Sequence, residues 1–362
     1  MKILFLEPFY GGSHKAFADG LIQHSSHWVD LLSMPSRFWK WRMRGAALHF
    51  SEKVKNIERY DLIIASGLMS TADFKALVGE CPPVIVYFHE NQFSYPIAPG
   101  ERMDYQFGFT DITSALAADK VLFNSQTHMA MFFDHMDLFI RKMPDFQPLW
   151  VAERIRNKTF VCYPGCTIGF PPHGIKKSAP PLIIWNHRWE HDKNPEAFFS
   201  AIEAVQNRGI DFRLALLGET FKSYPAIFDT VKEKIGARLV AFGYEPDRNA
   251  YMNWLLQGTV AISTANQENF GISMVEAAAC GCLPLVPNRL SYPEIIPTPF
   301  HETCIYNSRE ELVEKLIRLL ENHESCHKKS LQLSTEMVTR YSWKNRIDEF
   351  DRHMSDAAHR QA

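Results

Sequence analysis

The sequence lacks long apolar runs and lacks an excess of charge of either sign. No stretch reaches the roughly 18 to 20 uninterrupted apolar residues of a membrane span, and the N-terminal run MKILFLEP is too short for a secretory signal. The 362 residues include 39 Lys or Arg and 41 Asp or Glu, so no overall field attracts nucleic acid or a membrane. We therefore expect no membrane association, and any anionic partner must meet a local basic patch.

Cysteine is sparse, and several ligand motifs are missing. The seven cysteines are scattered without the paired CxxC spacing of zinc sites, which favours reduced thiols and a cytoplasmic location. The sequence has no GxGxxG fingerprint, so nicotinamide binding is not indicated. Asp134 and Asp137 are wrongly spaced for a DxD-type pair. We therefore expect neither a cofactor nor a metal ion.

The composition and the periodicity favour two folded α/β domains. Hydrophobic residues make up 46% and charged residues 22%, as in globular proteins, and the length suits two domains. In both halves, short apolar runs alternate with segments of helical period, which is typical of parallel βα units. The runs are KILFLEP, DLIIASG, VIVYFHE and KVLFNS in the first half, and PLIIWNH, FRLALLGE, RLVAFGY, VAISTA and LPLVP in the second.

A segment rich in Pro, Gly and Lys separates the two halves. Residues 166–181 have neither a helical nor a strand period, so we interpret them as a linker. The predicted domains are residues 1–165 and 182–340, each with a doubly wound parallel sheet. A further helix-like stretch covers residues 341–354. Ligands of such sheets bind beyond the carboxyl ends of the strands, so the residues after each apolar run are the candidate site.

Two glycines follow the first apolar run. Gly11 and Gly12 would let the backbone approach a ligand, and the next helix would offer unpaired N–H groups to an anion. Ser13 is a candidate N-cap of that helix, and His14 follows it. The alternative is an ordinary tight turn between a strand and a helix.

Four polar residues follow the run VIVYF, namely His89, Glu90, Asn91 and Gln92. His89 could hold or polarise a substrate, since a histidine exchanges its proton near neutral pH. The alternative is a structural histidine with its hydrogen bonds satisfied. The three neighbours are too polar for a core unless they are hydrogen-bonded or contact a ligand.

Cations and carboxylates gather after two apolar runs of the second half. Arg188 and Lys193 flank the start of a predicted helix and could neutralise a diphosphate, although the alternative is a solvated charged loop. Glu268 and Glu276 stand eight residues apart around a glycine turn and a helix of small residues. A carboxylate such as Glu276 on an apolar helix is costly unless it meets a polar ligand, and the diol of a nucleotide ribose is one.

The block from Glu268 to Pro284 resembles the E-x7-E signature of the retaining family 4 glycosyltransferases of the GT-B class. The resemblance implies two Rossmann-like doubly wound domains facing a central cleft, with the 341–354 helix docking on the first. It implies that Glu268 faces the donor sugar, that Glu276 binds the ribose, and that Arg188 and Lys193 hold the diphosphate. It further implies donor contacts from the backbone of Asn269, Phe270 and Gly271, from Gly11 and Gly12, and from Gly243 and Tyr244 beside the base.

The first half resembles the tRNA-queuosine mannosyltransferases, on the segments FYGGSHK, KWRMR, YFHENQ and YQFG. The resemblance implies transfer of mannose, with retention, from GDP-mannose to the queuosine base in the anticodon of a tRNA for aspartate. Front-side attack is implied, in which the departing diphosphate helps to deprotonate the acceptor. His89 and Glu268 are then the catalytic candidates. The implied tRNA contacts are Ser13, His14, Arg37, Lys40, Trp41, Arg42, Arg44, Glu90, Asn91 and Gln92.

Residues 37–44, RFWKWRMR, interleave four cations with aromatic side chains. The rings could stack on unpaired bases while the cations meet phosphates. The alternative is an amphipathic helix with Phe38 and Trp41 packed inward.

Two other functions stay open for the protein: the same chemistry on a lipid or polysaccharide acceptor, and an RNA-binding relative without turnover. The sequence leaves the oligomeric state open.

Overall fold

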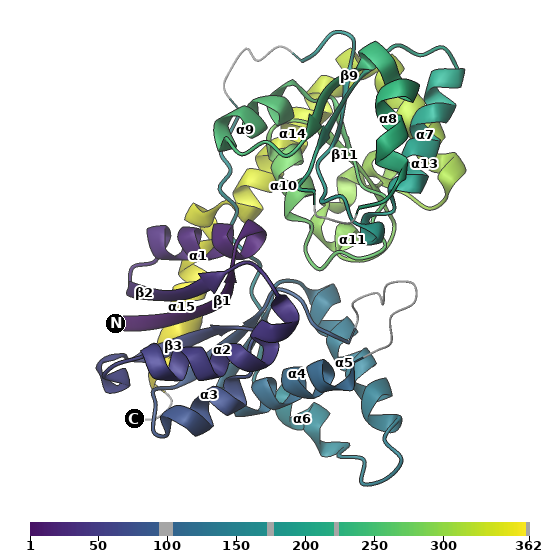
Figure 1. Cartoon of the computed structure of the whole chain (residues 1–362). Helices are drawn as coiled ribbons and strands as arrows, with labels where there is room; N and C mark the ends of the chain where they lie inside the picture. The colour runs from purple at the N-terminus through teal and green to yellow at the C-terminus, as the bar shows by residue number, and fades with distance from the viewer. Residues whose placement is uncertain (94–103, 172–176, 221–223, 360–362) are drawn as a thin grey trace. The chain divides into compact units, whose positions relative to one another are not determined.

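The computed structural model describes all residues except 94–103, 172–176, 221–223 and 360–362. The chain forms two compact units, residues 1–167 with 343–362, and residues 168–342. Figure 1 shows a parallel sheet with helices in each unit. Of the predicted linker 166–181, residues 172–176 lie outside the described part, and residues 168–181 otherwise group with the second unit.

The first unit contains a six-stranded sheet in the order β2-β1-β3-β4-β5-β6, and every pairing is parallel. Its strands are β1 (Lys2–Tyr10), β2 (Trp28–Pro35), β3 (Leu62–Ser66), β4 (Val84–Phe88), β5 (Lys120–Phe123) and β6 (Thr159–Val161). Its helices are α1 (Gly12–His24), α2 (Trp39–Lys53), η1 (Ile57–Arg59), α3 (Thr71–Val78), α4 (Tyr105–Ala117), α5 (Gln126–Arg141), α6 (Trp150–Arg156) and α15 (Trp343–Ala358).

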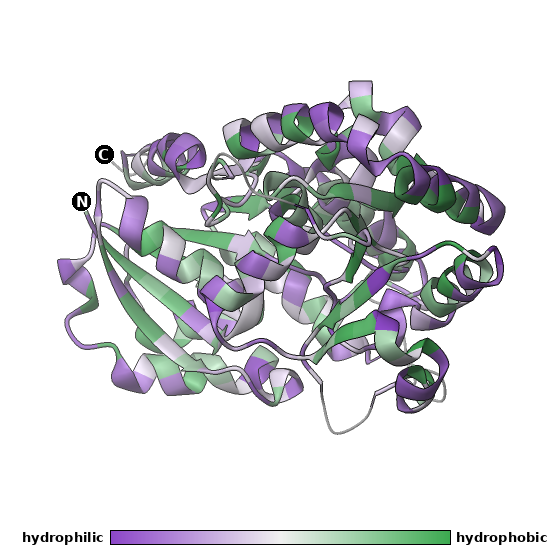
Figure 2. Ribbon diagram, turned by 90° about the horizontal axis from the view of Figure 1, so that it is seen from above, coloured by the Kyte–Doolittle hydropathy of each residue, from purple (hydrophilic) through white to green (hydrophobic). Residues whose placement is uncertain are grey.

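The side chains of β1 divide the core of this unit into two layers, because successive residues of a strand point to opposite faces. Ile3 and Phe5 join the layer formed with α1 and α15, whereas Leu4 and Leu6 join the layer formed with α2 and α3. In Figure 2 the strands carry mainly hydrophobic residues, while the helices mix both kinds. The unit therefore has helices on both faces of its sheet.

Helix α15 packs against α1 through Trp343. Its ring lies close to two glycines, and a Cβ added at Gly20 or at Gly165 would fall 1.9 Å or 2.2 Å from it. Phe17 of α1 contacts both Trp343 and Phe350 of α15. Two glycines thus make room for the indole that attaches the last described helix to the first unit.

The second unit contains a parallel sheet in the order β12-β11-β10-β7-β8-β9. Its strands are β7 (Leu182–Trp185), β8 (Arg213–Leu217), β9 (Leu239–Gly243), β10 (Val260–Ile262), β11 (Leu283–Pro287) and β12 (Ile305–Tyr306). Its helices are η2 (His191–Lys193), α7 (Pro195–Asn207), α8 (Ile227–Ile235), η3 (Gly236–Arg238), α9 (Arg248–Gln257), α10 (Ile272–Ala279), α11 (Tyr292–Ile295), η4 (Thr298–Phe300), α12 (His301–Cys304), α13 (Arg309–Glu321) and α14 (His323–Tyr341).

The sequence analysis did not predict three of the strands, namely β2, β6 and β12. β2 is an edge strand paired only with β1, and it mixes exposed polar and aromatic residues, so it lacks the continuous apolar run of a central strand. β6 and β12 have three and two residues, too few for a period to show. The two doubly wound sheets were nevertheless predicted from the remaining runs, and that prediction is confirmed.

Candidate functional site

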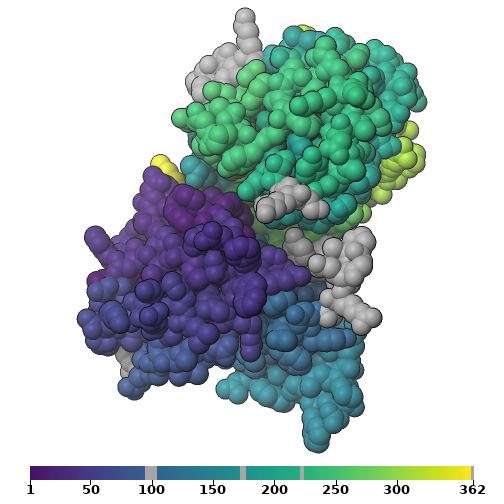
Figure 3. Space-filling model, in the orientation of Figure 1, coloured from purple at the N-terminus to yellow at the C-terminus, as the bar shows by residue number. Residues whose placement is uncertain are grey.

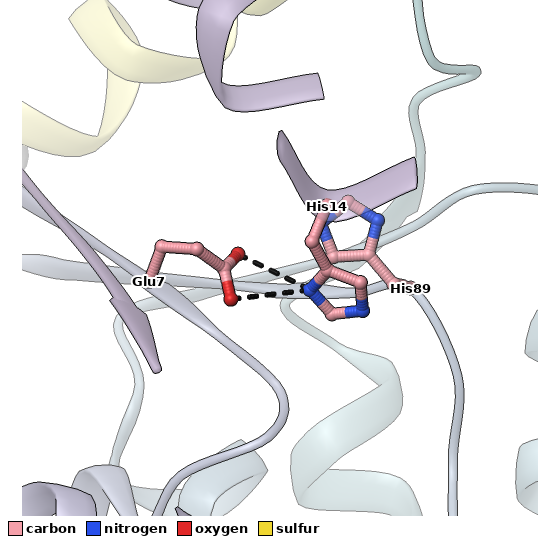
Figure 4. Close-up of side chains that lie close together, drawn as sticks. All are labelled: Glu7, His14 and His89. Atoms are coloured by element: carbon pink, nitrogen blue, oxygen red, sulfur yellow. Dashed lines mark hydrogen bonds and ion pairs between the residues drawn. The ribbon is translucent and has the colours of Figure 1, made fainter. Parts of the chain in front are cut away.

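A buried ion-paired cluster lies at the carboxyl ends of β1 and β4. Nδ1 of His14 lies 3.2 Å from both carboxylate oxygens of Glu7, and its Nε2 lies 3.3 Å from Glu90. The rings of His14 and His89 lie beside each other with centroids 4.1 Å apart (Figure 4). We call Glu7, His14, His89 and Glu90 the histidine cluster. It brings together three of the residues that the sequence analysis had singled out.

Glu7 is fully buried, although it is part of β1 rather than of the loop after it. One of its oxygens also accepts the N–H of Phe9 at 2.8 Å. A buried carboxylate needs a charged or hydrogen-bonding partner, and His14 is placed to provide one from the first turn of α1. The sequence analysis included Glu7 in the apolar run KILFLEP and gave it no role, because a single carboxylate within such a run is not distinguished from the strand around it.

The glycine turn differs from the prediction in detail. Ser13 is not the N-cap of α1, since Gly11 occupies that position and no side chain caps the helix. A Cβ at Gly11 would fall 2.1 Å from Oγ of Ser36, so close packing by itself requires glycine there. Gly12 has φ +52° and open space around the position of a Cβ. Of the two predicted donor contacts, Gly12 is the one with room for a ligand.

The two neighbouring histidines have opposite protonation preferences. Burial opposes a charge on His14, but Glu7 and Glu90 outweigh it and raise the pKa of His14 to about 10. Burial, together with His14 and His128, lowers the pKa of His89 well below its usual value. The expectation that His89 exchanges its proton near neutral pH is therefore wrong. His89 remains a predicted catalytic residue, but as a neutral imidazole.

The segment after β4 is fixed by residues that the sequence analysis missed. Asn124, which follows β5, donates from its amide to the backbone oxygen of His89 at 2.9 Å, and its own oxygen lies 2.7 Å from Nδ1 of His128. The N–H of Gln92 donates to Asp111 at 2.7 Å, and burial raises the pKa of that carboxyl well above its usual value. Asn124 could have been found from the sequence, because it is a polar residue directly after the apolar run KVLF.

Among the described residues, two groups of side chains could supply three ligand atoms to a metal ion: Glu7, His14 and His89, and Cys162, Glu349 and His353. In the first group, His14 and Glu7 already neutralise each other. In the second, the ammonium group of Lys120 lies 3.3 Å from Nδ1 of His353, where it would repel a cation. Both groups are explained without a metal, and the predicted absence of a metal stays a prediction.

A second polar cluster lies at the start of α10. The carboxylate of Glu276 accepts from Nη2 of Arg248 at 2.5 Å and from the hydroxyl of Tyr251 at 3.0 Å. The amide of Asn186, directly after β7, donates to Tyr251 at 2.9 Å and to the backbone oxygen of Ser273 at 3.0 Å. Glu276 is buried, as expected, but both of its oxygens are engaged by residues that the sequence analysis did not assign.

Lys193 contacts groups in the loop before α10 as well as the neighbouring Asp192. Its buried ammonium group donates to the backbone oxygen of Gln267 at 2.7 Å and lies 3.0 Å from Asp192 and 3.5 Å from Glu268. Burial lowers the pKa of Lys193, but the two carboxylates outweigh burial and raise it overall. Lys193 therefore carries a full charge and fixes the loop that holds Glu268. We call Lys193, Arg248, Glu268 and Glu276 the glutamate cluster.

The remaining predicted donor contacts differ in exposure. Arg188 is exposed and lies 3.0 Å from Glu190, so it can turn toward a ligand more readily than Lys193. Gly271 donates its N–H to Glu268 at 3.2 Å. Its φ of +91° explains why the turn has a glycine at this position. Gly243, at the end of β9, has φ +117°, and the neighbouring Tyr244 is exposed.

Two more of these donor contacts lie in the loop just before α10. Phe270 is buried and packs edge-on against Tyr341, with ring centroids 5.4 Å apart. The side-chain oxygen of Asn269 accepts from the amide of Gln267 at 3.1 Å. Only the backbone of these two residues was assigned to the donor, and their side chains support the loop.

The basic segment 37–44 comprises the two residues before α2 and the first six residues of that helix. Phe38 and Trp41 are 67% and 78% exposed, so the alternative in which both pack inward is wrong. Met43 provides the buried contact instead, and Trp39 rests on Phe107 of α4 at a centroid distance of 5.3 Å. Arg37, Lys40 and Arg44 are exposed, whereas Arg42 is half-buried.

Comparison with known structures defines the class. Sucrose-phosphate synthase from Thermosynechococcus elongatus has a TM-score of 0.77 at 14% identity, covering 98% of this chain and 99% of that one. Residues 171–331 match the family model of the group 1 glycosyl transferases. The chain therefore has the GT-B glycosyltransferase fold, which confirms the predicted fold class. No helix in the described part of the chain is long and apolar enough to cross a membrane.

Closer relatives define the family. Residues 2–166 match the model of the N-terminal region of tRNA-queuosine alpha-mannosyltransferase. A Drosophila melanogaster protein of that name is 37% identical over 382 residues, 98% of this chain and 97% of the relative. A GDP-mannose-dependent alpha-(1-6)-phosphatidylinositol dimannoside mannosyltransferase of Mycobacterium tuberculosis is 26% identical over 148 residues, 41% of this chain and 37% of the relative. The chain belongs to the tRNA-queuosine alpha-mannosyltransferase family and is a glycosyltransferase.

Proposed function

We propose that this enzyme transfers mannose, with retention, from GDP-mannose to the queuosine base in the anticodon of the tRNA for aspartate. The family supports the reaction type, and the printed name of the mycobacterial relative supports the donor. The observation that carries the proposal is the glutamate cluster, in which Glu268 and Glu276 are fixed beside Lys193 and Arg248.

On the donor side, we assign Glu276 to the ribose hydroxyls and Glu268 to the hydroxyls of the transferred sugar. Tyr251 and Arg248 hold Glu276 in one position before the nucleotide arrives, and each carboxylate oxygen has a second lone pair for a ribose hydroxyl. Lys193 and the exposed Arg188 supply positive charge to the diphosphate, whose negative charge grows as the sugar leaves. This reaction includes no metal step and no cofactor.

In the proposed reaction, the bond between the sugar carbon and the diphosphate breaks, and a hydroxyl of the queuosine base bonds to that carbon on the same face. The hydroxyl proton passes to the departing diphosphate. His89, held neutral, contributes a hydrogen bond to the sugar rather than a proton. Gly12 offers its backbone to the donor, while the polar segment Glu90 to Gln92 meets the acceptor base.

On the acceptor side, we assign the start of α2 to the RNA. Its exposed aromatic side chains, Phe38 and Trp41, alternate with cations, and base stacking requires such solvent-facing rings. Arg37 lies over the ring of Phe38, and Lys40 lies over that of Trp39. A tRNA acceptor also agrees with a cytoplasmic location, which we propose for the enzyme.

The decisive experiment is mass spectrometry of tRNA nucleosides after incubation with each of several nucleotide sugars. We expect mannosylated queuosine only with GDP-mannose, and only in tRNA that carries queuosine. Transfer from another donor, or to unmodified tRNA, would overturn that part of the assignment. Transfer to a phosphatidylinositol acceptor would favour the lipid alternative, and tRNA binding without donor turnover would favour the RNA-binding alternative.

A further inference from the structure

A second aromatic and basic surface lies on the first unit, away from the residues assigned above. It is formed by the end of α5, the start of α6 and the connection between them. Phe146 is 92% exposed and Trp150 is 56% exposed. Figure 3 shows the chain around residue 150 protruding at the lower edge of the first unit. We call Arg141, Lys142, Phe146, Trp150 and Arg154 the α5-α6 surface.

Phe146 has an unusual backbone conformation. Only five non-glycine residues in the described part of the chain have positive φ, and two of them are asparagines, which adopt that conformation readily. Two others are Phe146, at φ 45°, and Phe38, at φ 57°. A bulky residue in this conformation is strained. Each of the two holds a phenyl ring in solvent at a turn.

The turn that carries Phe146 is ordered by its own hydrogen bonds. The amide of Gln147 donates to the backbone oxygens of Arg141 and Met143 at 3.1 Å and 2.9 Å. The N–H of Leu149 donates to the backbone oxygen of Gln147 at 2.9 Å. The ring is therefore presented on a fixed support, which lowers the entropy lost when a partner binds.

Charge identifies the kind of partner. Residues 141–156 contain four cations and two carboxylates, in a protein whose net charge is close to zero. One of the four, Arg141, is paired at 3.1 Å with Asp137 on the preceding turn of α5, so Lys142 and Arg154 carry most of the charge argument. The guanidinium group of Arg154 lies 5.9 Å from the centroid of the Trp150 ring, an arrangement that leaves both groups available to a planar anionic ligand. A lipid surface or an acidic protein could use the cations, but exposed rings beside cations favour stacked bases with phosphates.

Helix α4 links this surface to α2, because it contacts both α2 and α5. Trp39 of α2 contacts Phe107 of α4. On another face of α4, Phe109 contacts Phe139 near the end of α5, at a centroid distance of 4.9 Å. The two strained phenylalanines thus belong to surfaces joined through α4, and one extended RNA could contact both.

We propose that the α5-α6 surface is a second RNA-contact surface, on which Phe146 and Trp150 stack on unpaired bases while Arg141, Lys142 and Arg154 meet phosphates. The inference rests on the proposed function, because it takes the acceptor tRNA as the RNA. It adds a contact region that neither the family models nor the donor site defines.

Phe146→Gly provides the sharpest test. Glycine adopts positive φ without strain, so the variant should fold with unchanged or higher stability while losing the ring. We expect tRNA affinity to fall about 5- to 150-fold, as for the loss of one stacked base. Phe146→Tyr should retain wild-type affinity. Trp150→Ala should weaken tRNA binding to a similar extent, and neither loss should alter GDP-mannose affinity.

The matched control is Trp28→Ala, which removes an exposed tryptophan of β2, outside both proposed RNA surfaces, whose indole N–H donates to Asp30 at 2.8 Å. It should leave tRNA affinity unchanged. A blunt-ended RNA duplex without unpaired bases should bind the wild type and Phe146→Gly equally.

Normal tRNA binding by Phe146→Gly and Trp150→Ala would overturn the inference, and so would a change in self-association or in vesicle binding instead of tRNA binding. A wild-type enzyme that neither binds nor modifies tRNA would instead refute the proposed function itself.

Discussion

The histidine cluster of the first unit and the glutamate cluster of the second both place carboxylates beside cations at the carboxyl ends of strands, but the cations differ. In the first, Glu7 depends on His14, whose charge is lost at high pH. In the second, Glu276 depends on Arg248 and Glu268 on Lys193. The pKa values of these two cations are raised from ordinary values that are already high, so they keep their charge to a higher pH than His14 does. The two sites should therefore respond differently to pH.

The clusters also differ in burial. Glu7 and His14 are both buried, so their charges neutralise each other inside the protein, beside the ring of His89. In the second unit, Glu276 is buried but the side chain of its partner Arg248 is 47% exposed. The comparison indicates that the first cluster is a closed arrangement of buried charges, whereas the second is open to solvent through Arg248.

The largest effect should come from Lys193. Lys193→Met keeps most of the side-chain volume but leaves Asp192 and Glu268 without their buried cation. Removing one partner of a buried ion pair costs about 3 to 5 kcal/mol, so urea unfolding should show a loss of that size. The activity of the folded fraction should also fall, because Glu268 loses its support.

The matched control is Arg188→Met, since the side chain of Arg188 is 47% exposed whereas that of Lys193 is 9% exposed. The loss of stability should be smaller than in Lys193→Met. Donor turnover should fall by about 100- to 1000-fold if Arg188 stabilises the diphosphate in the transition state. Wild-type stability of Lys193→Met would show that Lys193 is not a buried structural cation.

The next largest effect should be a pH dependence confined to the first unit. The pKa of His14 in the folded protein, about 10, lies above its usual value of 6.5. Its contribution to stability is therefore complete below pH 6.5 and is lost as the pH rises toward 10. The stability difference between the wild type and His14→Gln should shrink over that interval, by up to about 1.4 kcal/mol for each pH unit.

Urea unfolding at pH 6, 7.5 and 9 measures this difference. His135→Gln is the control for the substitution itself, because His135 is exposed on α5. A difference for His14→Gln that stays constant from pH 6 to 9 would show that Glu7 and Glu90 do not raise the pKa of His14.

Local patterns in the sequence predicted the central strands and the site loops of both units. Central strands such as VIVYF form continuous apolar runs, and the loops after them collect polar residues, so the sheets and the site loops were recognisable. β2 was missed because an edge strand exposes polar and aromatic side chains. The E-x7-E spacing identified Glu268 and Glu276, since it is local in the sequence.

Partners that come from distant segments could not be predicted. Arg248 lies 28 residues from Glu276 in the sequence, and His14 and Glu90 lie 76 residues apart. No periodicity encodes such contacts. The low pKa of His89 depends on burial and on two other histidines. The presence of a histidine in the sequence therefore suggested the wrong protonation state. The outward direction of Phe38 depends on a positive φ that the sequence does not reveal.

A smaller effect should separate the two glutamates of the second unit. Glu276→Ala should weaken both GDP and GDP-mannose binding about 10- to 100-fold, because it removes hydrogen bonds from a charged group to the ribose. Glu268→Ala should weaken only GDP-mannose binding, since GDP has no sugar beyond the diphosphate. Calorimetric titration of both ligands with both variants measures the split. Equal losses of GDP affinity would refute this division of roles.

The smallest effect should come from a single cation of α2. Arg37 is exposed beside Phe38, so Arg37→Gln should remove one phosphate contact without disturbing the fold. Each phosphate contact to a single strand contributes about 0.7 to the slope of log affinity against log salt, so the slope should flatten by about that amount. Arg340→Gln, on α14 of the second unit, changes the net charge equally and should leave the slope unchanged. Titration of tRNA at four salt concentrations distinguishes the two variants. Equal slopes in both would mean that Arg37 acts only through the net charge of the protein, and that the RNA contacts of α2 come from its exposed rings.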